Sequence, residues 1–212
     1  AMLKFGRRSS LSTNKNTINA GNKFFNKKSQ HRMLQGIVPM VPTYDSSSEV
    51  TGSFIAKMKD GHKQQGQLVN KEPENPEDYI FQPYLEITSE YRVVVYHMNG
   101  EYHVSGVYKK TGSNASMTSI TSGEVYNVCK NIAVAAIKEL GYGASGVDIA
   151  MSKTEVKESL GYVMSGIGKL SGKISNGKIE GNMYFLEANT MPSLSNPMIL
   201  HDFVKSIKSN IK

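Results

Sequence analysis

The chain has 212 residues and a mass of 23.3 kDa, enough for one large domain or two small lobes. Its hydrophobic fraction of 39% and charged fraction of 20% are those of an ordinary globular protein and exclude wholesale disorder. The longest aliphatic run, residues 132–137, is far shorter than the roughly 20 residues that span a membrane. A single cysteine excludes an internal disulfide and a metal site built from cysteines, so we expect a cytoplasmic protein with no membrane partner.

Hydrophobic periodicity and turn residues predict these elements in chain order: a short strand near 2–5, a helix over 26–34, strands over 53–58, 68–69, 79–85, 92–97 and 102–108, a helix over 121–140, strands over 146–150 and 183–186, and a helix that begins at Asn196. Asn99-Gly100 predicts a hairpin, because both turn positions need a positive φ. Thr121 and Glu124 form a capping-box pattern at the start of the long helix. The succession of hairpins and helices, with no repeat of fixed period, favours an α+β fold with antiparallel sheets.

Three segments fall outside this regular pattern. Residues 1–25 are polar and basic and are expected to form a loose arm. Residues 61–66, bounded by Gly61 and Gly66, form the tip of a hairpin that can close over a ligand. Residues 152–182 are rich in glycine and lysine and are interpreted as a long hairpin insertion.

The charge balance favours a polyanionic partner. Lys and Arg number 25 and Asp and Glu 18, which gives a net charge of +7 and an isoelectric point near 9.3. Such a balance suits nucleotides, nucleic acid or an acidic peptide. A soluble protein with a lysine-rich surface fits the same numbers, so charge does not choose among these classes.

Two carboxylates and an amide predict a metal site. Asp148 lies in the apolar strand Gly-Val-Asp-Ile-Ala, where an acid is costly unless a partner binds it. Glu187 and Asn189 are two residues apart, so their side chains share one face of a strand. Together the three residues form an all-oxygen donor set that suits Mg²⁺. The alternative is that both acids pair with lysines at the ends of their strands.

Three cations are candidates for binding phosphate. Lys57 interrupts an apolar strand just before the glycine-bounded loop, where its ammonium group and the loop amides can meet a phosphate. Lys27 begins the first helix, and Arg92 begins an apolar strand, where it can clamp a phosphate or a carboxylate. Taken alone, each of these residues also fits a solvated surface cation.

In their order along the chain, these features resemble the ATP-grasp superfamily, most closely its carboxylate–amine ligases of the peptide-glutamate ligase type. The resemblance covers residues 26–205 and rests on six stretches: Asn26-Lys27 with Met33-Leu34 and Gly36-Ile37, Ile55-Ala56-Lys57 with Gly61 and Gly66, Phe81-Gln82-Pro83-Tyr84-Leu85, Glu90-Tyr91-Arg92, Gly146-Val147-Asp148-Ile149, and Leu186-Glu187-Ala188-Asn189 followed by Thr190-Met191-Pro192. Each stretch is weak by itself, and their order and spacing carry the resemblance.

The resemblance implies a two-lobed α+β ATP-grasp domain over 26–212, with the nucleotide between a smaller lobe at about 37–85 and a larger lobe at about 86–212. The residues it implies for ATP are Lys27, Lys57, the lid residues Gly61 and Gly66, the adenine hinge Gln82, Tyr84 and Leu85, and also Glu90, Lys110 and Asn114. It further implies two Mg²⁺ ions, or Mn²⁺ in their place, held by Asp148, Glu187 and Asn189.

The implied reaction joins a carboxylate to an amine, or to a thiol. The substrate carboxylate attacks the γ-phosphorus of ATP while Lys57 and Arg92, the implied catalytic residues, offset the charge. This attack displaces ADP and forms an acyl phosphate, and the acceptor then takes the acyl group and displaces inorganic phosphate. Catalysis of this kind depends on positioning and electrostatics, so no nucleophilic side chain is needed. A basic surface favours an acidic peptide or protein as substrate.

The chain departs from the family pattern in its acceptor region. The family carries a separate N-terminal domain, whereas only the 1–25 arm precedes the first helix here. We therefore expect a partner chain or a second copy to complete the acceptor site. An arginine expected just before Asn114 is missing, and the family's Pro-Gly after the metal motif is Pro192-Ser193 in this sequence.

Two other classes of function stay open. Residues 57–61, Lys-Met-Lys-Asp-Gly, approach the Lys-x-Asp-Gly of polynucleotide ligases, but Met58 stands two residues before Asp60, so the register is off by one. A binding module is the second class, either an ATP-grasp fold without turnover or a basic nucleic-acid binder with tyrosines among its basic residues. Retention of all three implied metal ligands argues against loss of turnover.

Overall fold

The structure is a computed structural model in which residues 4–5, 17–18, 26–59, 67–111, 116–154, 181–190 and 192–211 are described. Several sequence predictions lie outside the described residues: the loop 61–66 with Gly61 and Gly66, Asn114, and most of the insertion at 152–182. No described helix is both long enough and apolar enough to cross a membrane.

The described helices are α1 (Lys27–Leu34), α2 (Glu124–Leu140) and α3 (Pro197–Asn210), with two short 3-10 turns, η1 (Ser47–Glu49) and η2 (Pro76–Asp78). The described strands are β1 (Lys4–Phe5), β2 (Thr17–Ile18), β3 (Phe54–Met58), β4 (Leu68–Val69), β5 (Tyr79–Pro83), β6 (Ile87–Met98), β7 (Glu101–Thr111), β8 (Ser116–Ile120), β9 (Ala144–Ser152) and β10 (Asn182–Asn189).

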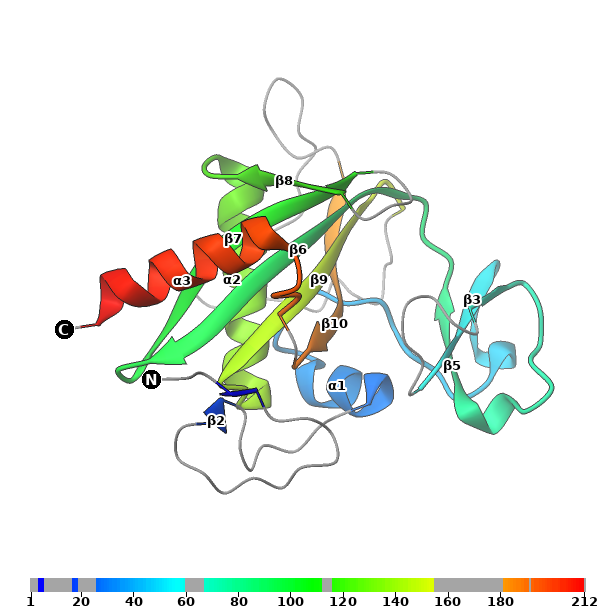
Figure 1. The fold of residues 1–212 in the computed structure, drawn as a ribbon. Coiled ribbons are helices and arrows are strands. Elements are labelled where there is room, and N and C mark those ends of the chain that lie inside the picture. Colours follow the sequence, from blue (N-terminus) through cyan, green and yellow to red (C-terminus); the bar gives the residue numbers. More distant parts are fainter. Residues whose placement is uncertain are drawn as a thin grey trace.

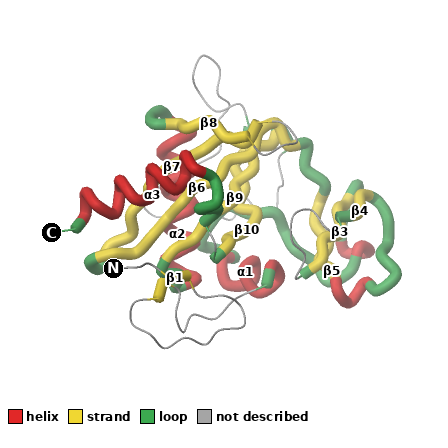
Figure 2. The backbone as a smooth tube through the Cα atoms, in the orientation of Figure 1, coloured by secondary structure: helices red, strands yellow, loops and turns green. Residues whose placement is uncertain are grey.

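The strands form two main sheets. The larger sheet has the order β10-β9-β6-β7-β8, and every neighbouring pair in it is antiparallel. The smaller sheet has the order β4-β3-β5 and is also antiparallel. Figure 1 shows the larger sheet at the centre of the molecule and the smaller sheet to one side, beyond α1. Loops join the two, as Figure 2 shows, and the predicted α+β fold with antiparallel sheets is confirmed.

The two faces of the larger sheet pack against different helices. Val93 and Val95 of β6 belong to a core shared with α1 and α2, whereas Val94 and Tyr96 belong to a core shared with α3. Because strand side chains alternate between faces, Arg92 lies on the same face as Val94 and Tyr96. This face, which α3 covers over β6 and β7, also carries the candidate functional residues.

The start of the long helix differs from the sequence prediction. α2 begins at Glu124 and its N-cap is Gly123, at a φ of 95°, so the capping box of Thr121 and Glu124 does not form. Glycine has no capping side chain, but it reaches this φ without strain. Strand β8 was not predicted, because its sequence Ser-Met-Thr-Ser-Ile is polar and largely exposed and lacks a clear apolar face.

Candidate active site

The candidate site is centred on one row of residues that crosses three strands of the larger sheet. Arg92 of β6 lies opposite Asp148 of β9, and Asp148 lies opposite Glu187 of β10. Side chains directly opposite one another on adjacent strands share a face, with their Cβ atoms roughly 4.5–5.5 Å apart. Asn189, two residues after Glu187, lies opposite Gly146 on the same face. The sheet therefore brings together residues that are far apart in the sequence.

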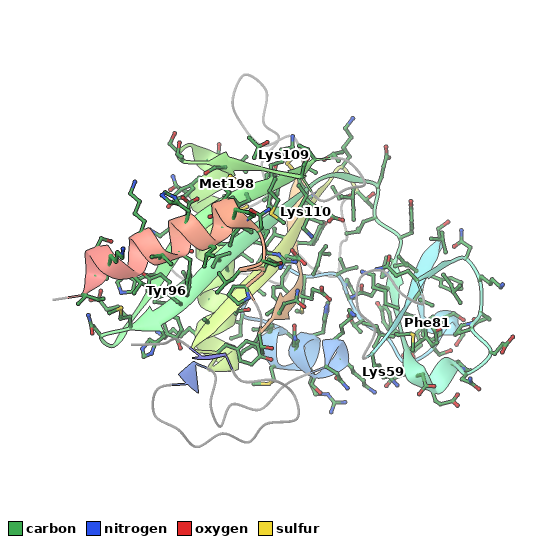
Figure 3. The ribbon with its side chains drawn as sticks, in the orientation of Figure 1. Lys59, Phe81, Tyr96, Lys109, Lys110 and Met198 are labelled. Carbon is green, nitrogen blue, oxygen red and sulfur yellow. The ribbon has the colours of Figure 1, made fainter. Side chains whose placement is uncertain are left out.

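Asp148 is buried, with 5% of its surface exposed, and both of its carboxylate oxygens bind cations. Arg92 donates two parallel bonds, from Nε to Oδ1 at 2.6 Å and from Nη2 to Oδ2 at 2.7 Å. Nζ of Lys110, a residue of β7 labelled in Figure 3, lies 3.0 Å from the same Oδ1 and 3.3 Å from Oε2 of Glu90. Paired bonds between ions of opposite charge fix the geometry of both partners. These four residues thus form one ion-pair network.

Gly146 of β9 leaves the space that the Arg92 side chain occupies. A Cβ atom at this position would stand 2.9 Å from Nη1 of Arg92, 3.1 Å from its Cδ, and 3.2 Å from Cα of Pro192. Nη1 also donates to Oγ of Ser193 at 2.6 Å. The guanidinium group is therefore held by hydrogen bonds to Asp148 and Ser193, and it lies beside the backbone of Gly146.

We expect Gly146→Ala to lower the free energy of unfolding by about 1–3 kcal/mol, because the new methyl group meets Arg92 on one side and the backbone of Pro192 on the other. Urea unfolding measures this loss. In a background that already carries Arg92→Ala, the same substitution should cost less, since one of the two obstacles is gone. A loss below about 0.5 kcal/mol in the otherwise unchanged protein would contradict the packing argument.

The first helix brings Lys27 to Glu187. Asn26 caps α1, since its side-chain oxygen accepts the backbone N–H of Ser29 at 2.9 Å. Nζ of Lys27, the first residue of the helix, lies 3.5 Å from Oε2 of Glu187. The other carboxylate oxygen, Oε1, accepts Nδ2–H of Asn189 at 3.1 Å. A predicted phosphate lysine and two of the three predicted metal ligands therefore lie in direct contact.

Lys57 of β3 adds a cation from the smaller sheet. Its pKa is lowered from 10.5 to about 8, chiefly by burial and also by the positive charge of Lys27. The negative charges of Glu187 and Glu90 act in the opposite direction. The site therefore gathers the cations Lys27, Lys57, Arg92 and Lys110 around the carboxylates Glu90, Asp148 and Glu187. This excess of positive charge favours an anionic ligand.

The site offers oxygen donors of the kind that Mg²⁺ uses, although the Asp148 carboxylate is already paired with Arg92 and Lys110. Asp148, Glu187 and Asn189 share one face of two adjacent strands and supply carboxylate and amide oxygens, which Mg²⁺ prefers. Within the described part of the chain, no group of three or more His, Cys, Asp and Glu side chains could hold a metal. A Mg²⁺ held by Asp148, Glu187 and Asn189 would need to take the rest of its coordination from phosphate oxygens and water.

The predicted adenine hinge lies on β5 and just beyond it. Gln82 is 2% exposed, and its Nε2–H donates to Oγ1 of Thr43 at 2.8 Å. Leu85 is buried with Tyr184 of β10, whereas Tyr84 is 45% exposed. The side chain of Gln82 is therefore engaged inside the protein, and contact between these hinge residues and adenine stays a prediction.

Sequence reasoning missed Gln30 and His31, and it named Ser193 only as a departure from the family pattern. Gln30 and His31 of α1 hydrogen-bond to the backbone of β10, and no sequence motif marks a helical Gln-His pair for such a role. Burial is the main reason why the pKa of His31 falls to about 4, so its ring is neutral at pH 7. Ser193 has a positive φ of 58°, the conformation that favours glycine, at the position where the resemblance leads us to expect one.

A cavity of about 430 Å³ lies between α1 and the segment that follows it. It is lined by Lys28, His31, Arg32 and Gln35 and by residues 40–45. None of the site residues predicted from the sequence lines this cavity.

No protein-family model matches this chain, and no curated protein matches it in sequence. Solved structures do match its fold. The chain is similar to N5-carboxyaminoimidazole ribonucleotide synthetase from Thermotoga maritima, with a TM-score of 0.57 and 14% identity over 84% of this chain and 45% of that one. It is also similar to biotin carboxylase from Campylobacter jejuni in its β-γ-ATP complex, with a TM-score of 0.57 and 14% identity over 84% of this chain and 43% of that one. A third similar structure is the ATP-grasp ligase PsnB in complex with a minimal precursor. Its TM-score is 0.50, and the identity is 16% over 88% of this chain and 64% of that one.

This chain has the ATP-grasp fold. It spans between 43% and 64% of the length of these three structures. At identities of 16% and below, the likeness concerns the arrangement of the chain, and the chemistry must be argued from the side chains described above.

Proposed function

We propose that this chain is an ATP-dependent ligase that activates a carboxylate as an acyl phosphate and transfers it to an amine, or to a thiol. The observation that carries the proposal is the convergence at one site of Lys27, Lys57 and the row Arg92–Asp148–Glu187. Four cations around acids that suit Mg²⁺ are what a bound triphosphate requires. The ATP-grasp fold supports ATP as the nucleotide.

The residues of the chain have separate roles in this proposal. Asp148, Glu187 and Asn189 hold Mg²⁺, which neutralises and orients the β- and γ-phosphates when bound. Lys27 of α1 and Lys57 of β3 bind phosphate oxygens. Arg92 and Lys110 fix the Asp148 carboxylate, and Arg92 offsets the charge that develops as the substrate carboxylate attacks the γ-phosphorus.

Further parts of the proposal concern segments beyond this network. The smaller lobe is 37–85 and the larger lobe 86–212, after the arm 1–25, and the loop 61–66 closes over the phosphates through Gly61 and Gly66. Gln82, Tyr84 and Leu85 line the adenine, and Glu90 and Asn114 complete the nucleotide contacts. We also propose a cytoplasmic protein that acts on an acidic peptide or protein, with a partner chain or a second copy supplying part of the acceptor site.

Nucleotide binding without turnover is the second candidate. It is favoured by the pairing of both Asp148 oxygens with cations, which compete with Mg²⁺ for this carboxylate. The two candidates differ in their metal requirement, because the ligase reaction would need Mg²⁺ to offset the charge of the phosphates.

Thermal melting with ATP tests the proposed function. At about 100 times its dissociation constant, Mg·ATP should stabilise the protein by about 2.7 kcal/mol, which raises the Tm of a chain of this size by roughly 5–10 °C. ATP with EDTA should raise it much less. Glu187→Ala should lose the Mg²⁺-dependent part of the shift, because it removes a carboxylate donor whose partners are Lys27 and Asn189.

Glu139→Ala, an exposed acid on α2, is the matched control and should respond to Mg·ATP like the wild type. Equal shifts with and without Mg²⁺ would favour nucleotide binding without turnover. No shift under any condition, or a full Mg²⁺ response in Glu187→Ala, would exclude the proposed site.

A further inference from the structure

The strand that carries Glu187 and Asn189 is an edge strand of the larger sheet. β10 pairs with β9 on one side, and its other side faces α1 and the segment after it. An edge strand presents backbone N–H and C=O groups that need partners. The backbone N–H of Phe185 donates to the carbonyl of Pro39 at 2.8 Å. Beyond this point the partners are side chains of α1.

Gln30 acts as such a partner with both ends of its amide group. Its Nε2–H donates to the carbonyl of Ala188 at 2.9 Å, and its Oε1 accepts the N–H of the same residue at 2.8 Å. Gln30 is buried, with 5% of its surface exposed, so these bonds form away from water. The paired bonds imitate the contact that a neighbouring strand would make.

His31 binds the strand two residues earlier. Its Nε2 lies 3.0 Å from the carbonyl oxygen of Leu186, which can only accept, so Nε2 carries the ring proton. Nδ1 is then the acceptor for the hydroxyl of Thr43, at 2.9 Å. The amide of Gln82 donates in turn to the Thr43 oxygen at 2.8 Å. A directed chain of hydrogen bonds thus runs from β5 to β10.

These bonds lie on both sides of Glu187, and β10 is irregular at the residue before it, Leu186. Phe185 pairs with Ile149 and Glu187 with Asp148, so Leu186 is an extra residue in the ladder. A bulge of this kind turns the following side chain and leaves backbone groups unpaired. His31 binds the carbonyl of the extra residue, and Gln30 binds the residue immediately after Glu187.

We propose that Gln30 and His31 are positioning residues that hold the bulge of β10 so that Glu187 faces Asp148 and Lys27. The same helix carries Lys27 at its first turn, so α1 positions both Lys27 and the Glu187 carboxylate that pairs with it. The inference rests on the proposed function only in naming Mg²⁺·ATP as the ligand that needs this arrangement. The bonds themselves belong to the protein without ligand.

Two measurements on Gln30→Met test the inference. Methionine has nearly the same length as glutamine but cannot hydrogen-bond to Ala188. In the protein without nucleotide, hydrogen exchange of the Ala188 amide should become at least tenfold faster, because its acceptor is gone. The ratio of the ATP dissociation constant in EDTA to that in Mg²⁺ should fall about tenfold, while the constant in EDTA changes less than about twofold.

Gln35→Met makes the same substitution at an exposed position next to the end of α1 and should leave both quantities unchanged. His31→Phe keeps an aromatic ring against Phe185 but loses the hydrogen bonds of both ring nitrogens, and it serves if Gln30→Met does not fold. It should lower the same ratio. A folded Gln30→Met that keeps the wild-type ratio overturns the inference, and so does one that loses ATP binding equally with and without Mg²⁺.

The proposed function and the positioning role of Gln30 can be tested separately. If wild-type protein binds ATP equally in Mg²⁺ and EDTA, the proposed function and the role toward Mg²⁺ fail together. Faster exchange of the Ala188 amide in Gln30→Met would still support the positioning of the bulge. If exchange is unchanged in a folded variant, the positioning role is wrong whatever the nucleotide data show.

Discussion

Asp148→Ala is expected to lower the free energy of unfolding by about 3–5 kcal/mol, the typical cost of removing one partner from a buried ion pair. The Arg92 side chain is 11% exposed and has two of its bonds to this carboxylate, and Lys110 has a third. Removing Asp148 leaves the largely buried Arg92 guanidinium without its anion, whereas Lys110 keeps Glu90 at 3.3 Å.

Urea denaturation of the ligand-free protein measures this effect. Glu187→Ala is the control, because the Glu187 side chain is 29% exposed and is paired with a single lysine at 3.5 Å, so it should cost less than about 1 kcal/mol. If Asp148→Ala proves as stable as Glu187→Ala, the ion-pair network contributes nothing to folding. In that case Asp148 would be interpreted as a metal ligand alone.

Much of the fold could be predicted because its signals are local. Asn99 and Gly100 both have a positive φ, as the turn required, and they join the long strands β6 and β7. Asn26 and Asn196 cap helices with their side chains, as their positions indicated. β8 and the Gly123 cap were missed because their formation depends on tertiary contacts and on backbone conformation, which no residue pattern in that stretch signals.

The sequence predicted which residues belong to the candidate site, but it did not predict most of the contacts between them. The sequence left open whether Arg92 clamps a phosphate or a carboxylate, and the structure places it on Asp148. That contact depends on the pairing of β6 with β9, and the elements β7, β8 and α2 lie between these two strands in the sequence. Gln30 could not have been singled out, since its role exists only once α1 lies along β10.

The charged side chain of Lys57 lowers the stability of the ligand-free protein, and an anionic ligand would offset this cost. Burial and the nearby charge of Lys27 lower its pKa to about 8, so the folded protein disfavours the charged form. The unfolded chain binds that proton more tightly, and fold stability should therefore rise as the pH increases from about 8 toward 10.5. An anionic ligand reverses this preference, because a phosphate beside the ammonium group favours the charged form.

Lys57→Met is accordingly expected to weaken Mg·ATP binding at pH 7 by roughly 30- to 150-fold, the equivalent of about 2–3 kcal/mol for a lost charged hydrogen bond. The variant should be at least as stable as the wild type, because a desolvated charge has been removed. Wild-type affinity should fall as the pH rises above about 8, where Lys57 becomes neutral, and the variant should lack this dependence. Calorimetric titrations at pH 7 and pH 9 measure both effects, with the exposed Lys138→Met as control. A variant that binds Mg·ATP as tightly as wild type, or keeps its pH dependence, would remove Lys57 from the nucleotide site.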